Sequence, residues 1–180
     1  MSDERTLSAF DPASAPDDLV VRAAIRRSGS GVALVYRVHG AGRLDIPPPR
    51  PAPGRADRLW EHTCLEAFLA PTGGTAYWEL NVSPAGDWNL YRFARYREAM
   101  ETETRVAATA CATACAGDDL QVEFSLSGVP ELARDLDVGL TAVLKARDGT
   151  LSYWALRHAD ARPDFHRRET FALRLPGGRT

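Results

Sequence analysis

The sequence predicts an all-β protein, an antiparallel β-sandwich of about ten strands. Apolar and polar residues alternate along most of the chain after residue 18, as they do in half-buried strands. Short turn segments rich in Gly, Pro, Asp and Ser separate these stretches at regular spacing, and no long amphipathic helix interrupts them. These observations favour an antiparallel sandwich, with a barrel as the alternative, over a parallel α/β sheet.

The composition is that of an ordinary globular domain. The chain has 180 residues, of which 44% are hydrophobic and 26% are charged, enough for one domain with its own core. We expect residues 1–16 to form a flexible N-terminal arm and residues 17–176 to form the single domain. The net charge of −2 gives no strong field toward nucleic acid or an anionic membrane, so we expect neither as a partner.

The N-terminus and the cysteines bear on the cellular compartment. The first residues lack the apolar region of a signal peptide, and no apolar run is long enough for a membrane span. The cysteines Cys64, Cys111 and Cys115 are odd in number and contain no CxxC pair, which argues against a disulfide framework. We therefore expect a cytoplasmic protein.

The first predicted hairpin and the segment after it differ sharply in composition. Leu19–Arg26 and Val32–His39 flank the turn Ser28-Gly-Ser-Gly31, a hairpin signature. Residues 46–54 are rich in proline, which lacks the donor that a sheet requires, so this segment lies outside the sheets. It is either a stiff surface loop or, through Pro47–Pro53, a docking segment for a protein partner.

The other predicted strands follow the same alternation. They are Cys64–Ala70, Tyr77–Ser83, Leu90–Tyr96, Arg105–Ala114, Asp119–Leu126, Val138–Lys145, Leu151–His158 and Phe171–Leu175. In the Ala-rich stretch at residues 107–116, helix propensity competes with strand formation. Residues 129–136 are expected to hold a short helical turn.

Two of these strands carry acids among apolar residues. Glu79 and Asn81 share a face of their strand, while Trp78 points to the core. The strand around Glu66 is apolar on both faces, so we expect it to be central and Glu66 to be covered. Arg92 and Asn81 are the expected donors to Glu66. Its carboxylate is then either half of an internal ion pair or part of a ligand-facing polar floor.

Aromatic residues near these acids suggest a polyhydroxylated ligand, because rings cover its C–H face while acids and amides take its hydroxyls. Trp60, in a loop beside Glu61 and His62, is a stacking platform or a rim residue of the core. Trp88 has the same two interpretations, and Trp154 is a core candidate. His158 ends a strand, and we expect residues 162–168, which contain His166, to reach over the sheet end.

Signatures of catalysis are mostly absent. There is no GxSxG, Walker, Rossmann or HExxH motif. The alternative to simple binding is a hydrolase or isomerase that uses Glu66 or Glu79 with His158. His62, His158 and His166 lack the short spacing of a metal site, so we expect no metal and no cofactor.

One run of motifs resembles a known family. Trp60-Glu-x-x-Cys-Leu-Glu66-Ala-Phe-Leu and Tyr77-Trp-Glu-Leu-Asn81-Val-Ser-Pro-Ala-Gly86 resemble the DOMON-like domains related to family 9 carbohydrate-binding modules. Thr63 or Cys64 stands where many of them have Asp. The segments 151–158 and 163–166 look like those of an uncharacterised bacterial, MurB-associated branch.

The resemblance, which spans residues 17–176, implies a jelly-roll type β-sandwich that binds a sugar or, in other branches, haem. It implies that Trp60 stacks on the ligand, that Glu66 accepts from hydroxyls, and that Trp154 or Trp88 closes an aromatic sandwich. Haem-binding relatives use Met and His ligands, and the one internal Met here is Met100. The sequence therefore predicts a non-catalytic domain for a small saccharide, with Trp60, Glu61, His62, Glu66, Glu79, Asn81, Trp88, Arg92, Trp154, His158 and His166 as candidate ligand-binding residues.

Overall fold

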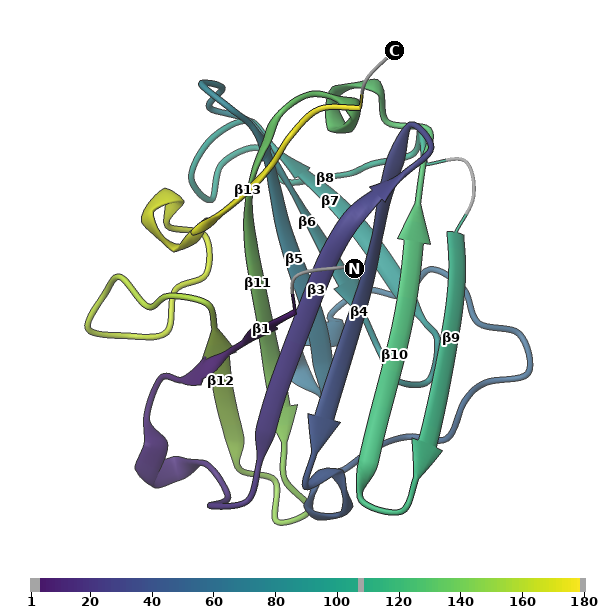
Figure 1. Ribbon diagram of the computed structural model, residues 1–180, viewed down its shortest axis with the longest axis vertical. Helices are drawn as coiled ribbons and strands as arrows, with labels where there is room; N and C mark the ends of the chain where they lie inside the picture. Colours follow the sequence, from purple (N-terminus) through teal and green to yellow (C-terminus); the bar gives the residue numbers. More distant parts are fainter. Residues whose placement is uncertain (1–3, 107–108, 179–180) are drawn as a thin grey trace.

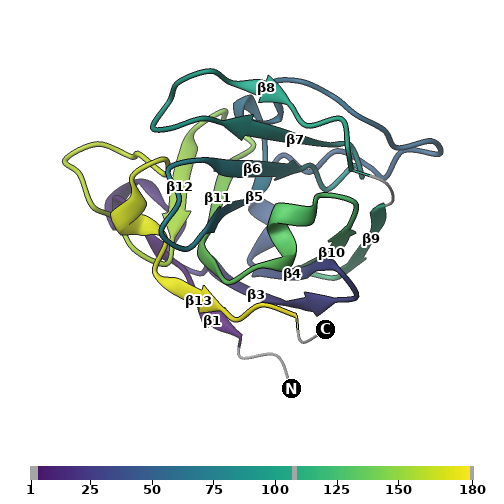
Figure 2. The ribbon, with the colours of Figure 1, turned by 90° about the horizontal axis from the view of Figure 1, so that it is seen from above.

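The chain folds into two antiparallel β-sheets packed face to face (Figure 1). The computed structural model describes residues 4–106 and 109–178. These residues contain 13 strands rather than about ten, because three strands of only two residues escape a periodicity argument. The predicted antiparallel sandwich is confirmed, and Figure 2 shows its two layers from above.

The first sheet has five strands in the order β1-β3-β4-β10-β9. Their bounds are Arg5–Thr6 (β1), Val20–Ser28 (β3), Gly31–His39 (β4), Thr109–Ala116 (β9) and Asp119–Leu126 (β10). The predicted hairpin is confirmed, with Ser28 paired to Gly31 and Gly29 at a φ of 56° in the turn. The strand expected at Arg105–Ala114 includes residues 107 and 108, which lie outside the described residues.

The second sheet has eight strands, in the order β2-β12-β11-β5-β6-β7-β8, with β13 beside β11. Their bounds are Ser8–Ala9 (β2), Cys64–Pro71 (β5), Tyr77–Val82 (β6), Trp88–Phe93 (β7), Glu101–Thr102 (β8), Leu136–Lys145 (β11), Leu151–Ala155 (β12) and Leu173–Leu175 (β13). The strand around Glu66 lies between β11 and β6, so its predicted central place is confirmed.

The main core fills the space between the sheets. Alternate residues of β4 and β10 point into it, such as Leu34, Val122 and Phe124, and they meet Leu65 and Leu80 from the second sheet. The hydroxyl of Tyr36 crosses this core and donates to the main-chain carbonyl of Glu66. Burying these apolar side chains is the main source of stability of the sandwich.

The outer face of the second sheet is covered as well. A second apolar cluster forms there from strand residues such as Phe68, Tyr77 and Phe93 together with Phe165 and Phe171 from the loop after β12. That loop projects beside β12 in Figure 1. A sheet that is covered on both faces explains why every residue from Cys64 to Ala70 is buried.

The N-terminal segment differs from the expected flexible arm. Arg5 and Thr6 pair with Ala23 and Arg22 of β3. Ser8 and Ala9 of β2 pair with β12 in the other sheet. Leu7, between the two short strands, is buried in the core. Such edge pairing has no signal in a polar sequence, because two-residue strands are too short to show alternation.

The proline-rich segment lies outside the sheets, as predicted, but the turn between β6 and β7 holds its ends. Arg50 N donates to the Ala85 carbonyl, and Gly54 N donates to the Asp87 carboxylate. A Cβ added to Gly86, whose φ is 96°, would lie 2.9 Å from the Pro53 Cβ. Glycine is therefore required where the loop crosses this turn.

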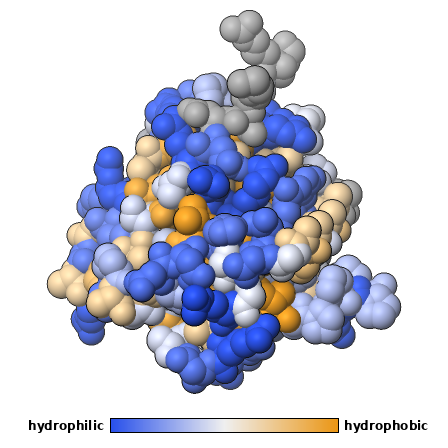
Figure 3. All heavy atoms as spheres, turned by 60° about the horizontal axis from the view of Figure 1, so that its bottom comes forward, coloured by the Kyte–Doolittle hydropathy of each residue, from blue (hydrophilic) through white to orange (hydrophobic). Residues whose placement is uncertain are grey.

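In the part of the chain that the structure describes, every helix is a single 3₁₀ turn. They are η1 (Pro12–Ser14), η2 (Ala41–Arg43), η3 (Leu59–Glu61), η4 (Pro130–Ala133) and η5 (Arg168–Thr170), and η4 confirms the helical turn expected at residues 129–136. None of the helices in the described residues has the length or apolarity to cross a membrane. Figure 3 shows a face that is mostly hydrophilic, with small apolar patches.

Candidate functional site

A cavity of about 410 Å³ opens on the outer face of the second sheet, and we call it the outer-face cavity. Its floor is formed by strand residues, namely Glu66, Phe68, Glu79, Phe93, Val143 and Tyr153. Its walls come from loops and a 3₁₀ turn, namely Trp60, Arg97, Met100, Pro163, Phe165 and His166. It therefore joins buried acids with aromatic rings.

Two other hollows, on the outer face of the first sheet, lack this combination. They are lined by alanines of β9 and by charged residues of β3, β4 and β10. Arg26, Arg37, His39, Asp119 and Glu123, five of those charged residues, are all exposed. A small-molecule site places a few polar groups in a mostly covered setting, so the outer-face cavity is the better candidate.

Glu66 is the most buried acid of the cavity floor, with 3% of its surface exposed. It lies opposite Thr141 of β11 and opposite Asn81 of β6. The Thr141 hydroxyl donates to Glu66 Oε2 at 3.0 Å. Burial, followed by the charge of Glu79, raises the pKa of Glu66 to about 8. Glu66 is therefore mostly protonated at neutral pH.

Glu79 lies diagonally across the ladder from Glu66, since its partner on β5 is Phe68. Only 6% of its surface is exposed, and Asn81 Nδ2 donates to Glu79 Oε1 at 2.9 Å. Burial raises the pKa of Glu79, against the stabilising amide donor. The two acids thus share one poorly solvated floor.

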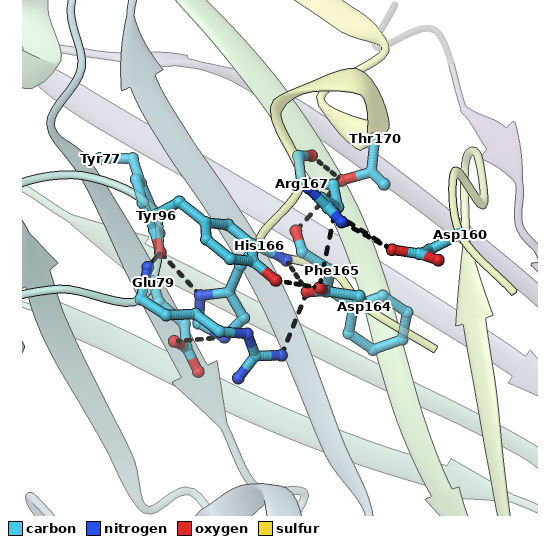
Figure 4. Close-up of polar contacts among 10 residues, drawn as sticks. Tyr77, Glu79, Tyr96, Asp160, Asp164, Phe165, His166, Arg167 and Thr170 are labelled. Carbon is cyan, nitrogen blue, oxygen red and sulfur yellow. Dashed lines mark hydrogen bonds and ion pairs between the residues drawn. The ribbon is translucent and has the colours of Figure 1, made fainter. Parts of the chain in front are cut away.

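His166 connects the covering loop to this floor. Its Nδ1 lies 2.7 Å from the Tyr77 hydroxyl and its Nε2 lies 3.7 Å from Glu79 Oε2, as Figure 4 shows. Burial lowers the pKa of His166 to about 4, so the ring is neutral at pH 7. The Arg97 amide donates to the Tyr77 oxygen, which favours donation of the hydroxyl proton to Nδ1 and leaves the Nε2 proton facing Glu79.

The rim is held together by charged pairs around Asp164. Its carboxylate accepts from the Tyr96 hydroxyl at 2.6 Å and from Arg97 at 3.1 Å. Arg167 lies 3.8 Å from Asp164 and pairs more closely, at 2.9 Å, with Asp160. These contacts tie the loop after β12 to the loop after β7 (Figure 4).

Trp60 forms another wall. It lies in η3, immediately before β5, and is half-buried. Its ring meets Tyr91 edge-on, with the ring centroids 5.8 Å apart. Tyr91 is itself fixed by its hydroxyl bond to Asp57 at 2.6 Å. The indole is therefore supported on one side and lines the cavity on the other.

The structure brings Trp60, Glu66, Glu79 and His166 together, but several expected residues lie elsewhere. Asn81 is fully buried and reaches the site only through its bond to Glu79. Glu61 and His62 are exposed, and Glu61 pairs with Arg58 at 2.5 Å.

Arg92 is not a donor to Glu66, which corrects the sequence prediction. Arg92 pairs with Trp78 in the ladder and lies near the Trp78 ring. Alternation along β7 turns Tyr91 and Phe93 toward the cavity side and Arg92 to the opposite side. Thr141 supplies the hydrogen bond to Glu66 instead.

Neither Trp88 nor Trp154 lines the cavity. Trp88 packs against the inter-sheet core, with the Arg55 guanidinium 4.4 Å from its ring centre. Trp154 is buried in the same core, as expected, and its indole donates to Ser152 at 3.0 Å. The second aromatic surface of the cavity comes from Tyr153, Phe165 and Phe93.

His158 is also outside the cavity, because its Nε2 lies 2.9 Å from the Ser8 carbonyl. Within residues 4–106 and 109–178, no group of three or more His, Cys, Asp or Glu residues is arranged to hold a metal ion. The acid–base version of the site that uses His158 therefore lacks its histidine, and His166 occupies the corresponding place beside Glu79.

Sequence reasoning missed Thr141 and Phe165. Thr141 is the one hydroxyl residue in the otherwise apolar stretch Val138–Leu144, and an isolated polar residue in a buried strand signals a polar partner. Phe165 adjoins His166 in a loop that was expected to cover the sheet end, but no pattern indicated which rings it would meet.

Solved structures with the same fold include two linked by name to carbohydrates. A Bacteroides uniformis ATCC 8492 protein, provisionally assigned as carbohydrate-binding, is 17% identical, with 98% of this chain and 87% of that chain covered and a TM-score of 0.68. A family 9 carbohydrate-binding module from Caldicellulosiruptor kristjanssonii, in complex with cellotriose, is 12% identical, with 99% and 84% covered and a TM-score of 0.59. Such identities show a shared fold alone. No protein-family model and no curated protein matches the chain.

Proposed function

We propose that this chain is a non-catalytic domain that binds a small saccharide in the outer-face cavity. One observation carries the proposal: Glu66 and Glu79 are buried acids on the floor of an open hollow that is walled by Trp60 and Phe165. Sugars combine hydroxyls, which carboxyl groups bind, with apolar C–H faces, which rings cover. The cavity volume lies within the usual range for small-molecule sites, about 300–1,000 Å³.

The comparisons support this proposal at the level of the fold. A module with this sandwich architecture has been described in complex with cellotriose. The motif around Trp60 and Glu66 also supports a finer proposal, that the chain belongs to the DOMON-like relatives of such modules. Trp60 is the stacking platform in this proposal, and Tyr153 or Phe165 takes the role of the second ring.

A thermal-shift screen tests the proposed function. Monosaccharides, oligosaccharides, nucleotide sugars and haemin are added to the full chain, and a saccharide is expected to raise the melting temperature. Trp60→Ala removes the platform, which is worth on the order of 1–2 kcal/mol and should weaken binding by about 5- to 30-fold. Phe10→Ala removes another half-buried ring, outside the cavity, and serves as the matched control.

The result can contradict the proposal in two ways. Binding of Trp60→Ala as tight as that of the wild type would show that the indole does not touch the ligand. If Trp60→Ala fails to fold, Trp60→Leu keeps apolar contact with Tyr91 but lacks the flat ring, and it should show the same loss of affinity. A screen in which only haemin binds would also refute the proposed function.

A second candidate is acid–base chemistry on a saccharide at the same site. The raised pKa of Glu66 favours it, because a carboxyl group that keeps its proton near neutral pH can act as a general acid. Glu79 beside His166 would then be the base. An NMR time course of the bound saccharide, which shows bond cleavage or isomerisation, would distinguish this reaction from simple binding.

A further inference from the structure

The charges around the outer-face cavity are unequally distributed between its rim and its floor. On the rim, Asp164 and Asp160 are matched by Arg97 and Arg167. The floor carries Glu66 and Glu79, and their nearest basic partner among the described residues is the neutral ring of His166, 3.7 Å from Glu79. Among the described residues no cation forms an ion pair with either acid, and the more distant charge of Arg97 only partly offsets the effect of burial on Glu79.

These two acids have few donors: besides the two bonds named next, the Cys64 thiol is a weak donor toward Glu66, and the Nε2 proton of His166 faces Glu79 at 3.7 Å. Glu66 Oε2 accepts from the Thr141 hydroxyl and Glu79 Oε1 accepts from Asn81. Each carboxylate can accept several further bonds, and buried acids are stable as ions only when such bonds and an opposite charge are supplied. Both side chains line the cavity, so the missing partner can enter from solvent.

We propose that the saccharide bound in this cavity carries a protonated amine, and that the ammonium group lies between Glu66 and Glu79. This inference rests on the proposed function. Residues that are diagonal across an antiparallel ladder have Cα atoms about 7–8 Å apart, a span that one ammonium can bridge between two glutamate side chains. An ammonium has three donors and a positive charge, whereas a hydroxyl has one donor and no charge.

The aromatic walls suit the same ligand. Trp60, Phe93, Tyr153 and Phe165 line the cavity around the acids. The faces of such rings attract cations, and the attraction is stronger where water is excluded. An amino sugar therefore gains from both the acids and the rings, while its neutral parent gains only from stacking and hydroxyl bonds.

The groups that face the two acids do not supply a cation themselves. They are Tyr36, Cys64, Tyr77, Tyr91, His166 and Arg97. Burial raises the pKa of the three tyrosines and of Cys64, and it lowers the pKa of His166, so all five are neutral at pH 7. Arg97 is charged and lowers the pKa of Glu79, but its guanidinium pairs with Asp164 at 3.1 Å and forms no ion pair with either acid of the floor.

Ligand binding is consequently linked to proton release. Because burial raises the pKa of Glu66 to about 8, the acid carries its proton below that pH. A bound ammonium favours the ionised form and lowers this pKa, so binding near pH 7 expels a proton. A neutral sugar gives no such release.

Calorimetric titration of the full chain with matched sugars tests the inference. Glucosamine, galactosamine and mannosamine are compared at about pH 7 with their parent sugars and with their neutral N-acetyl forms. We expect at least one amino sugar to bind about tenfold more tightly than its parent, and the N-acetyl form to lose this gain. Repeating the titration in two buffers with different ionisation heats measures the released proton.

Variants locate the effect. Glu66→Gln keeps an acceptor for Thr141 but cannot ionise, so the affinity ratio between the amino sugar and its parent should fall toward one and the proton release should disappear. Glu123→Gln makes the same change at an exposed site on the other sheet and should leave both unchanged. If Glu66→Gln does not fold, Glu79→Gln should reduce the same preference.

The outcomes separate the inference from the proposed function. If a parent sugar binds but no amino sugar binds more tightly, the amine inference is wrong and the saccharide function stands. If neither the amino sugars nor any neutral saccharide binds, both are wrong. Tighter binding of an amino sugar that survives in Glu66→Gln and in Glu79→Gln would also overturn the proposed position of the ammonium.

Discussion

Replacing Glu66 with glutamine should change how the stability of the fold depends on pH. Burial and the neighbouring Glu79 raise the pKa of Glu66 from its ordinary 4.5 to about 8 in the folded protein. Because the folded pKa is the higher one, the folded state gains its full advantage from the protonated acid below about pH 4.5 and loses it progressively up to about pH 8.

The size of this effect follows from the pKa difference. A change of about 3.5 in pKa corresponds to about 5 kcal/mol of unfolding free energy. Glutamine cannot ionise, so Glu66→Gln escapes this loss. Near pH 5 the unfolding free energies of the variant and the wild type should differ only by a constant offset. Relative to that offset, the variant should be more stable than the wild type by several kcal/mol near pH 9.

Urea unfolding followed by tryptophan fluorescence at about pH 5, 7 and 9 measures these free energies. The contribution of His166 is present in both proteins, whereas Glu79 titrates together with Glu66, so the difference between the two curves reports the pair of acids. Glu123→Gln, at an exposed position, should follow the wild type. Parallel wild-type and Glu66→Gln curves would refute the idea that Glu66 is buried without a cation.

Two further predictions concern the covering loop and the proline-rich segment. Burial lowers the pKa of His166 to about 4, so the stability that the neutral ring contributes is complete above about pH 6.5 and is lost as the pH falls toward 4. His166→Gln should therefore weaken the dependence of the unfolding free energy on pH between about 4 and 6.5. An unchanged dependence in the variant would contradict the burial of His166. Gly86→Ala should lower the unfolding free energy by about 1–3 kcal/mol, because the added Cβ meets Pro53. Gly73→Ala, at a similar φ but with open space around it, should lower it less. Equal losses of unfolding free energy in urea would exclude the proline contact.

Local patterns were sufficient to predict the sandwich and its hairpins. Alternation is set by the two-residue repeat of a strand, so the inward face of β10, with Val122 and Phe124, could be read directly from the sequence. The two-sided apolar pattern around Glu66 likewise indicated a central, covered strand. These signals lie within one strand or one hairpin and need no long-range information.

The candidate site was harder to predict because it is assembled across strands and from distant loops. Arg92 was expected beside Glu66, but the relative faces of neighbouring strands depend on register, which places Tyr91 rather than Arg92 on the side of Glu79. His166 contacts Tyr77 from 89 positions away in the chain. No periodicity encodes such a contact, so the place of Phe165 emerges only from the folded structure, whereas Thr141 carried a signal as an isolated hydroxyl residue in an apolar strand.

The most direct test of the central claim is an NMR titration of isotope-labelled protein with the tightest saccharide from the screen. We expect the largest shifts at the Trp60 indole, at β5 and β6 around Glu66 and Glu79, and at the loop that carries His166. Shifts confined to the outer face of the first sheet, around Arg37 and Glu123, would contradict the assignment of the outer-face cavity as the binding site.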